Sequence, residues 1–173
     1  AGSRTGHYTV DHRPQLSDKL HNLKKGATVL YLCDNCGEIV YDTLLVELLV
    51  QRGISVTVAV RGGPIINDAL IEDARRAGMD RLGTIITNGA DCPGSALAHC
   101  SEEFREHFYQ ADLVISKGQG NFETLSEVDR ELFFLLTIKC KVLAQYLTER
   151  LDDGTEVSGN GEMVLLHHRG ERG

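Results

Sequence analysis

The chain has 173 residues, of which 42% are hydrophobic, enough for one well-filled core and too few for two ordinary domains. Its 18 basic and 25 acidic residues give a formal net charge of -7, and no stretch gathers Lys or Arg as a nucleic-acid partner would require. The apolar runs are far shorter than the roughly 20 residues that cross a bilayer. We therefore expect a single domain, residues 1–173, that binds neither nucleic acid nor membrane.

Both ends of the chain are expected to be loosely ordered, over residues 1–26 and 168–173. The chain begins with a polar stretch, and its tail has no apolar periodicity. The 5 cysteines are an odd number scattered through apolar segments, unlike the disulfide framework of a small secreted domain. This pattern favours a reducing, cytoplasmic setting.

Short β-rich apolar runs alternate with longer segments of helical period. This alternation predicts an α/β fold: a three-layer α/β/α domain with a mainly parallel central sheet of about six strands. The expected strands are residues 28–33, 55–60, 81–86, 113–116, 132–138 and 162–167. The expected helices are residues 37–51, 67–77, 95–109, 123–129 and 140–147.

Polar loops follow the first four expected strands. They carry carboxylates, amides, glycines and one lysine, in residues 34–38, 61–68, 87–94 and 117–123. Ligands of open parallel sheets bind beyond the carboxyl ends of the strands, so we expect the four loops to converge on one rim.

Asp34, Asn35 and Asp68 form the natural candidate for a metal site on this rim. Carboxylate and amide oxygens suit Mg²⁺ or Mn²⁺, whereas a zinc site more often uses Cys and His. The alternative is that these residues are only helix N-caps, because Asp and Asn satisfy the free N–H groups there. Caps explain neither the shared rim nor a lysine opposite, and one residue can serve both purposes.

Lys117 ends the fourth expected strand and is followed by Gly118 and Gly120. Backbone N–H groups of such a loop can point at an anion, and a lysine beside them is a point charge for phosphate. An exposed lysine in a flexible turn is the open alternative. The segment is neither a Walker loop nor a dinucleotide fingerprint, which would follow the first strand.

Glu38 and Asp42 lie four residues apart at the start of an expected helix, so they share one face. That face can look into the site. For Asp42, complementing the helix dipole is an equally good explanation.

Cys33 and Cys36 satisfy a C-x-x-C template, which suggests a redox or zinc site. No second pair at metal-site spacing follows them. We therefore interpret both as small packing residues.

Five segments in order carry motif-like clusters: DNCGEIVYD at 34–42, PIINDA at 64–69, NGADCPG at 88–94, DLVISKGQGNFE at 112–123 and FLLTIKC at 134–140. Together they resemble the damage-control phosphatases, long known as domain-of-unknown-function family 89. The match runs from about residue 28 to 147, and the intact KGQGNFE segment is similar to the stand-alone microbial branch. Five ordered motifs are far more specific than one glycine pattern.

The resemblance implies a divalent-metal-dependent phosphatase that hydrolyses phosphate monoesters of small metabolites, such as sugar phosphates or damaged phosphometabolites. It implies a small phosphorylated metabolite as the partner and Mn²⁺ or Mg²⁺ as the cofactor, with Co²⁺ or Ni²⁺ as alternatives. By motif, the metal ligands are Asp34, Asn35 and Asp68, and the phosphate contact is Lys117.

Further site residues are carried over from the same motifs. Glu38 and Asp91 are the catalytic candidates beside Lys117, as acceptors of a proton from water, and an Asp nucleophile stays open. The substrate-binding candidates are Asn121, Gly89 and Gly118.

Two other functions are kept as alternatives. An S-adenosylmethionine-dependent methyltransferase could use a similar sheet, but its usual glycine-rich turn after the first strand is absent. A non-catalytic module that binds a metal or a phosphate-bearing ligand fits if the chain is a fragment. The family usually carries a helical region before the first strand, where this chain has only a short polar lead.

Overall fold

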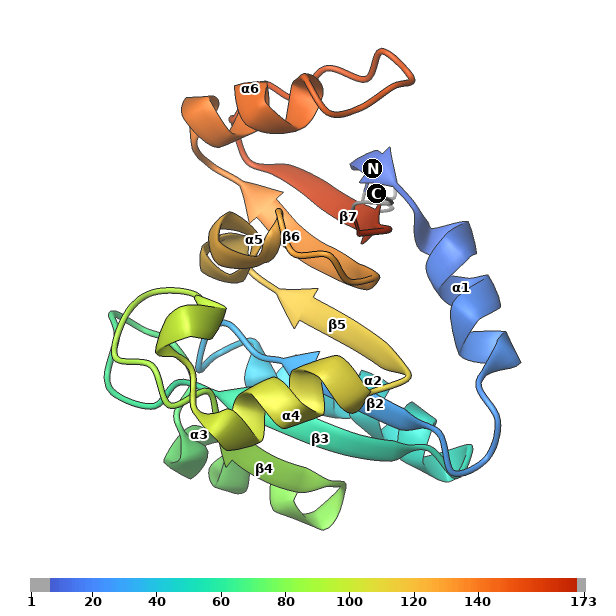
Figure 1. Ribbon diagram of the computed structural model, residues 1–173, viewed down its shortest axis with the longest axis vertical. Coiled ribbons are helices and arrows are strands. Elements are labelled where there is room, and N and C mark those ends of the chain that lie inside the picture. Colours follow the sequence, from blue (N-terminus) through green and yellow to red (C-terminus); the bar gives the residue numbers. More distant parts are fainter. Residues whose placement is uncertain (1–6, 171–173) are drawn as a thin grey trace, which may run out of the picture.

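The computed structural model describes residues 7–170, which form one seven-stranded sheet with helices on both faces (Figure 1). The strands are β1 Tyr8–Asp11, β2 Thr28–Leu32, β3 Ser55–Val60, β4 Thr84–Thr87, β5 Leu113–Lys117, β6 Leu132–Ile138 and β7 Glu162–His168. The helices are α1 Arg13–Asn22, α2 Ile39–Gln51, α3 Ile71–Ala77, α4 Glu102–Gln110, α5 Gln119–Leu125 and α6 Lys141–Thr148, with short 3₁₀ turns η1 Met79–Arg81 and η2 Leu97–His99.

The strand order across the sheet is β1-β7-β6-β5-β2-β3-β4. Every neighbouring pair is parallel except β6 and β7, which run antiparallel. The prediction of an α/β domain with a mainly parallel sheet is confirmed, with seven strands in place of about six.

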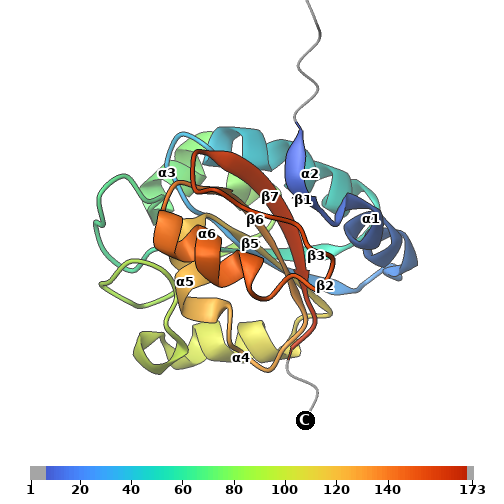
Figure 2. The ribbon, with the colours of Figure 1, turned by 90° about the horizontal axis from the view of Figure 1, so that it is seen from above.

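Two apolar clusters fill the space between the sheet and its helices. One contains Phe104 and Phe108 of α4 together with Phe122 of α5, and the other contains Leu16 of α1 and Val46 of α2. The helices α1, α2 and α3 therefore cover one face of the sheet, and α4, α5 and α6 cover the other, as Figure 2 shows from above. Strands buried on both faces explain the continuous apolar runs in the sequence.

The expectation of a loose chain start was wrong for residues 8–22, which form β1 and α1. Strand β1 pairs with β7, and Val10 and Leu16 are buried against the sheet. Pro14 stands in the first turn of α1, where its fixed φ is compatible with a helix. The apolar patterns of β1 and α1 are short, and the polar residues around them hide both elements in the sequence. His168, expected in the loose chain end, is instead the last residue of β7, and residues 1–6 and 171–173 lie outside the described residues.

Three of the five expected helices differ from the structure by more than two residues at one end or both. The helix expected at 67–77 begins only at Ile71, because residues 67–69 are held in extended contact with the loop after β2. The helix expected at 95–109 is divided into η2 and α4, and Ser101 caps α4 by accepting a hydrogen bond from the Phe104 N–H (3.2 Å). The helix expected at 123–129 lies earlier, as α5.

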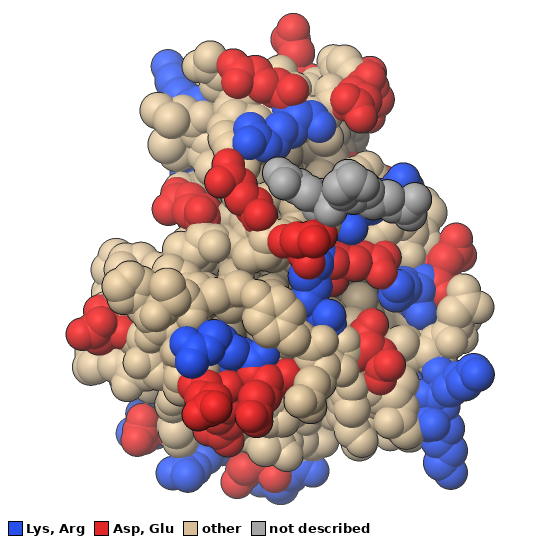
Figure 3. Space-filling view, in the orientation of Figure 1, with Lys and Arg blue, Asp and Glu red and all other residues tan. Residues whose placement is uncertain are grey.

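The surface carries both signs of charge interspersed on the face shown in Figure 3. Within residues 7–170, no helix is long and apolar enough to span a membrane.

The sheet has a switch point between β2 and β5. From β2 the chain moves one way to β3 and β4, and then returns to the other side of β2 to form β5. The crevice at the carboxyl ends of such strands is where ligands bind in open α/β sheets. The loops after β2 and β5 therefore occupy the position where a site is expected.

Candidate metal and phosphate site

The backbone itself brings the candidate metal ligands together. Asn35 and Asp68 form an isolated antiparallel bridge, and the Ala69 N–H donates to the Asp34 carbonyl oxygen (2.8 Å). The loop after β3 is thus tied to the loop after β2, so the sequence-predicted trio lies at one place on the rim.

The side chains of this trio form a polar group with excess negative charge. Asn35 Nδ2 donates to Asp34 Oδ2 (2.9 Å) and to Glu38 Oε1 (3.3 Å), so its Oδ1 is the atom left for a cation. Burial, followed by the nearby carboxylates of Asp68 and Glu38, raises the pKa of Asp34 to about 6. A positive charge placed here would relieve that crowding.

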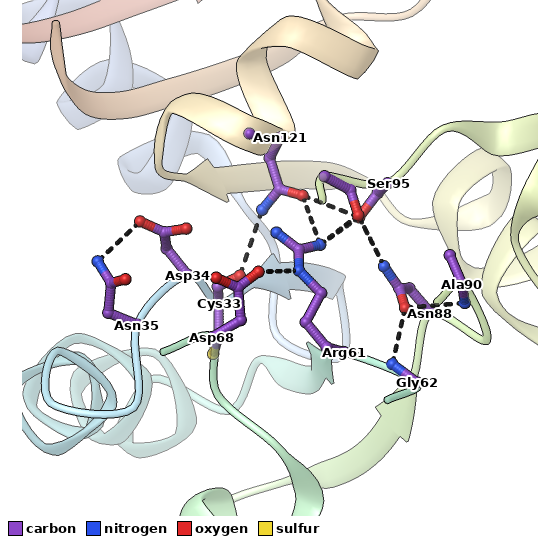
Figure 4. Close-up of polar contacts among 12 residues, drawn as sticks. Cys33, Asp34, Asn35, Arg61, Gly62, Asp68, Asn88, Ala90, Ser95 and Asn121 are labelled. Carbon is purple, nitrogen blue, oxygen red and sulfur yellow. Dashed lines mark hydrogen bonds and ion pairs between the residues drawn. The ribbon is translucent and has the colours of Figure 1, made fainter. Parts of the chain in front are cut away.

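Arg61 lies beneath the trio and was not anticipated. Its side chain is 3% exposed, and its Nε donates to Asp68 Oδ2. Its Nη1 donates to Ser95 Oγ (3.1 Å) and to Asn121 Oδ1 (3.0 Å), as Figure 4 shows. Its Nη2 is buried without a hydrogen-bond partner among the described residues. Arg61 thereby fixes one oxygen of Asp68 and leaves the other for a cation.

Lys117 lies at the end of β5 and faces the same rim. Its Nζ donates to Asp42 Oδ1 (2.8 Å) and to Glu38 Oε2 (3.1 Å). Burial alone would lower the pKa of Lys117, but the two carboxylates outweigh it and raise this pKa above its ordinary value. The ammonium group is therefore held in its charged form.

A cavity of about 500 Å³ opens beside these groups. Asp34, Asn35, Glu38 and Lys117 line its polar side. Its other side is formed largely by β6, β7 and the start of β1, through Tyr8, Leu135, Leu136, Thr137, Met163 and Val164. The volume lies within the range of small-ligand pockets, about 300–1,000 Å³.

Gly118 lines the cavity, and its contact with a substrate stays a prediction. Its N–H donates to the Leu135 carbonyl oxygen (3.0 Å), so this N–H is already used within the sheet. A Cβ at position 118 would overlap the carboxylate of Asp34, and the backbone there has φ +84°. The glycine is needed because the chain passes close to Asp34 in a left-handed conformation.

Asn121 is likewise a structural residue and not an exposed substrate contact. It is 0% exposed, and its Nδ2 donates to the carbonyl oxygens of Lys117 (2.8 Å) and Cys33 (3.2 Å). Its Oδ1 accepts hydrogen bonds from Arg61 and Ser95. These four contacts occupy the amide, so it ties β2, β5 and the Arg61 loop together.

The loop after β4 contributes less than the sequence suggested. The α-carbon of Gly89 lies against Ser101, where a Cβ would come within 2.7 Å of the serine Cβ, so this glycine serves loop packing. Asp91 is exposed and forms no hydrogen bond or ion pair with the residues that the structure describes. Asn88 is the buried residue of this loop, and its Oδ1 accepts from the N–H groups of Gly62 (3.0 Å) and Ala90 (3.1 Å).

The donor set of the trio fits a hard divalent cation. It consists of carboxylate and amide oxygens, the ligands that Mg²⁺ and Mn²⁺ prefer. Across residues 7–170 no three His, Cys, Asp or Glu side chains gather in a way that could hold a metal, so the Asn35 amide is a necessary part of this set. All 5 cysteines are free, and burial raises the pKa of the Cys33 thiol.

The residues that sequence reasoning missed are the buried partners Arg61, Asn88, Ser95 and Tyr31, whereas Asp42 does lie on a helix face that looks into the site. One signal was available for Arg61, since it directly follows an apolar strand that ends at the rim. The others lie inside helices, strands or loops, and only the tertiary fold gives them their partners.

The fold and the rim together define a class: an α/β domain with an oxygen-rich site and a charged lysine at the switch point of its sheet. The sequence matches the damage-control phosphatase ARMT1-like domain over residues 4–154. The chain belongs to this family. That resemblance, seen first in five ordered motifs, is confirmed.

Individual relatives agree with the family assignment. The chain is 43% identical over 143 residues to a damage-control phosphatase of Pyrococcus horikoshii, covering 76% of this chain and 50% of the relative. It is 40% identical over 167 residues to an uncharacterised protein of Methanocaldococcus jannaschii, covering 93% and 51%. It is 39% identical over 139 residues to a damage-control phosphatase of Archaeoglobus fulgidus, covering 79% and 48%.

A solved structure shares the fold. The crystal structure of a family 89 protein from Pyrococcus horikoshii superimposes with a TM-score of 0.83 at 37% sequence identity, over 95% of this chain and 54% of that one. The chain spans about half the length of the curated relatives it matches.

Proposed function

We propose that this chain is a divalent-metal-dependent phosphatase acting on phosphate monoesters of small metabolites, such as sugar phosphates or damaged phosphometabolites. The observation that carries the proposal is the meeting of two groups at the switch point. Oxygen donors of Asp34, Asn35 and Asp68 lie on the same rim as the ammonium group of Lys117. Two relatives named damage-control phosphatases support the same reading.

In this proposal, Asp34, Asn35 and Asp68 hold the cation, Mn²⁺ or Mg²⁺, with Co²⁺ or Ni²⁺ as alternatives. When bound there, the cation supplies positive charge to a phosphoryl oxygen and lowers the pKa of a water molecule. Arg61 orients Asp68, because its Nε donates to Oδ2 from a buried position.

Lys117 stabilises the negative charge of the phosphoryl group during the reaction. Its ammonium group faces the cavity and offsets negative charge on the phosphoryl oxygens as the leaving oxygen departs. The pairing of this lysine with two carboxylates keeps it positive at neutral pH.

Glu38 is our proposed acceptor of the proton from the attacking water. It lines the cavity, its side chain is 48% exposed, and it contacts both Asn35 and Lys117. A partly exposed carboxylate at this position can both receive a proton and release it to solvent. We place the activity in the cytoplasm, on the basis of the 5 free cysteines.

The test is a panel of sugar phosphates and other metabolite phosphates, assayed for phosphate release after chelator treatment and readdition of Mg²⁺, Mn²⁺, Co²⁺ or Ni²⁺. We expect release that depends on the added metal and is lost in Asp68→Ala. Asp80→Ala, which removes an exposed carboxylate on η1, is the matched control and should retain release. Binding of metal and phosphate without any release would instead indicate a non-catalytic module.

A further inference from the structure

We infer that Asp42, anchored by Tyr31, is a positioning residue that holds the Lys117 ammonium group at the cavity, while Glu38 is the partner that an incoming phosphate displaces. The catalytic consequence of this arrangement rests on the proposed function. The arrangement itself can be tested apart from turnover.

The three groups form a chain of contacts through the switch point. The Tyr31 hydroxyl on β2 donates to Asp42 Oδ1 (2.7 Å), and Lys117 Nζ at the end of β5 donates to the same oxygen (2.8 Å). Asp42 reaches this point from the first turn of α2. A tyrosine beneath, a carboxylate in the middle and a lysine at the cavity thus come from three separate elements.

This carboxylate is deeply buried for a charged group. Asp42 is 6% exposed, Tyr31 is 1% exposed, and Asp42 Oδ2 has no hydrogen-bond partner among the described residues. Burying a charge is costly, and apolar residues of similar volume are often at least as stabilising as a buried ion pair. An acid that only complements the helix dipole could remain exposed, so the dipole does not explain why Asp42 points inward.

The two carboxylates that bind Lys117 differ in their freedom to move. Glu38 has a side-chain exposure of 48% and can release Lys117 at little cost while it remains at the cavity, because exposed ion pairs contribute little. Asp42 is enclosed and is fixed by Tyr31. An ammonium group has three donors, so Lys117 can exchange its contact with Glu38 for a phosphate oxygen while Asp42 continues to hold it.

Such an anchor has a direct benefit for recognition of phosphate. A lysine has a long flexible side chain, and ordering it during binding costs conformational entropy. With Asp42 holding Nζ beforehand, the charge is already in place when the anion arrives.

The first measurement is the reactivity of Lys117 toward a small amine-acylating reagent, quantified by peptide mass spectrometry at mildly alkaline pH, with exposed Lys24 as an internal reference. Only the neutral amine reacts, so a charged and anchored lysine is protected. Asp42→Asn should raise the Lys117 rate about tenfold, because loss of this carboxylate removes a cause of the raised pKa of Lys117. Tyr31→Phe removes only one hydroxyl and should raise the rate by a smaller factor, about threefold.

The matched controls are Asp112→Asn and Tyr146→Phe. Asp112 accepts hydrogen bonds from Thr28 at the opposite end of β2, and the Tyr146 hydroxyl on α6 contacts Ser126 (3.1 Å). Both should leave the Lys117 rate unchanged. Circular dichroism establishes that each variant is folded, and if Asp42→Asn does not fold, Tyr31→Phe with its control still decides the question.

The second measurement is kinetic, with p-nitrophenyl phosphate and Mn²⁺. We expect kcat to fall in both variants, more in Asp42→Asn, while the dissociation constant for Mn²⁺ measured by calorimetry stays within about twofold of the wild-type value. A purely structural network would leave the Lys117 rate in both variants within twofold of wild type, and that result would overturn the inference. Unchanged kcat despite raised reactivity would overturn its catalytic part. The wild-type protein could release no phosphate while the Lys117 acylation rate is still highest in Asp42→Asn, lower in Tyr31→Phe and lowest in wild type. In that case the proposed function fails and the positioning of Lys117 stands.

Discussion

Gly118 lies directly against the carboxylate of Asp34, so that a side chain at position 118 would occupy the space of that carboxylate. Its backbone also has φ +84°, a conformation that residues with a Cβ rarely adopt. The loop after β5 is therefore shaped around a carboxylate of the loop after β2.

Gly118→Ala should consequently displace Asp34 and weaken binding of Mn²⁺ by at least about tenfold, because an incomplete oxygen cage binds the ion less well. Isothermal titration calorimetry measures the change. Gly63→Ala is the matched control, since nothing lies within 4 Å of a Cβ built there. Equal affinity in Gly118→Ala and wild type would show that Asp34 does not bind the ion.

Arg61→Lys should destabilise the domain even though the charge is retained. The lysine cannot reproduce the fork that contacts Asp68, Ser95 and Asn121 together, and unsatisfied buried partners cost about 1–3 kcal/mol each. Urea denaturation should show a decrease of about 2 kcal/mol or more in the free energy of unfolding. Arg75→Lys on the exposed side of α3 should change it by less than about 0.5 kcal/mol. Equal effects of the two substitutions would contradict the role given to Arg61.

The raised pKa of Asp34 predicts a pH dependence of stability in the presence of chelator. Burial and the neighbouring carboxylates raise the pKa of Asp34 from 3.8 to about 6, so the folded state binds more protons than the unfolded state between these values. The contribution of this group to stability therefore falls as pH rises through that window.

Asp34→Asn removes this contribution, so its stability relative to wild type should increase between about pH 4 and pH 7. Urea denaturation of both proteins at the two pH values gives the comparison. Mn²⁺ added at about pH 7 should stabilise wild type and not the variant. A difference that does not vary with pH would rule out a titration of Asp34 in this range.

The sheet could be predicted from sequence because most of its strands are continuous apolar runs. Strands such as β3 and β6 are buried on both faces, and their bounds were predicted correctly at Ser55–Val60 and Leu132–Ile138. By contrast, β1 has only Tyr8 and Val10 as an alternating signal and depends on pairing with β7 far along the chain. Such a partner is not visible in local sequence.

The candidate site was predictable in outline and not in detail. Asp34 and Asn35 follow β2 and Lys117 ends β5, so strand order alone brings them to one rim. Whether a polar residue on that rim faces the cavity or is used internally depends on tertiary contacts. Asn121 was predicted to bind substrate, but its amide forms hydrogen bonds with four groups of the protein. Arg61 was overlooked.

The measurement that tests the account most directly is a calorimetric titration of Mn²⁺ into Asp68→Ala and Lys117→Ala, beside phosphate-release kinetics on the same samples. Asp68→Ala should lose metal affinity and phosphate release together, with partial recovery of release at high Mn²⁺. Lys117→Ala should bind Mn²⁺ almost as wild type does, while kcat falls on the order of a hundredfold, the usual cost of removing one contact to developing charge. If Lys117→Ala loses the metal, or Asp68→Ala keeps both metal and turnover, the roles assigned to these two residues are wrong.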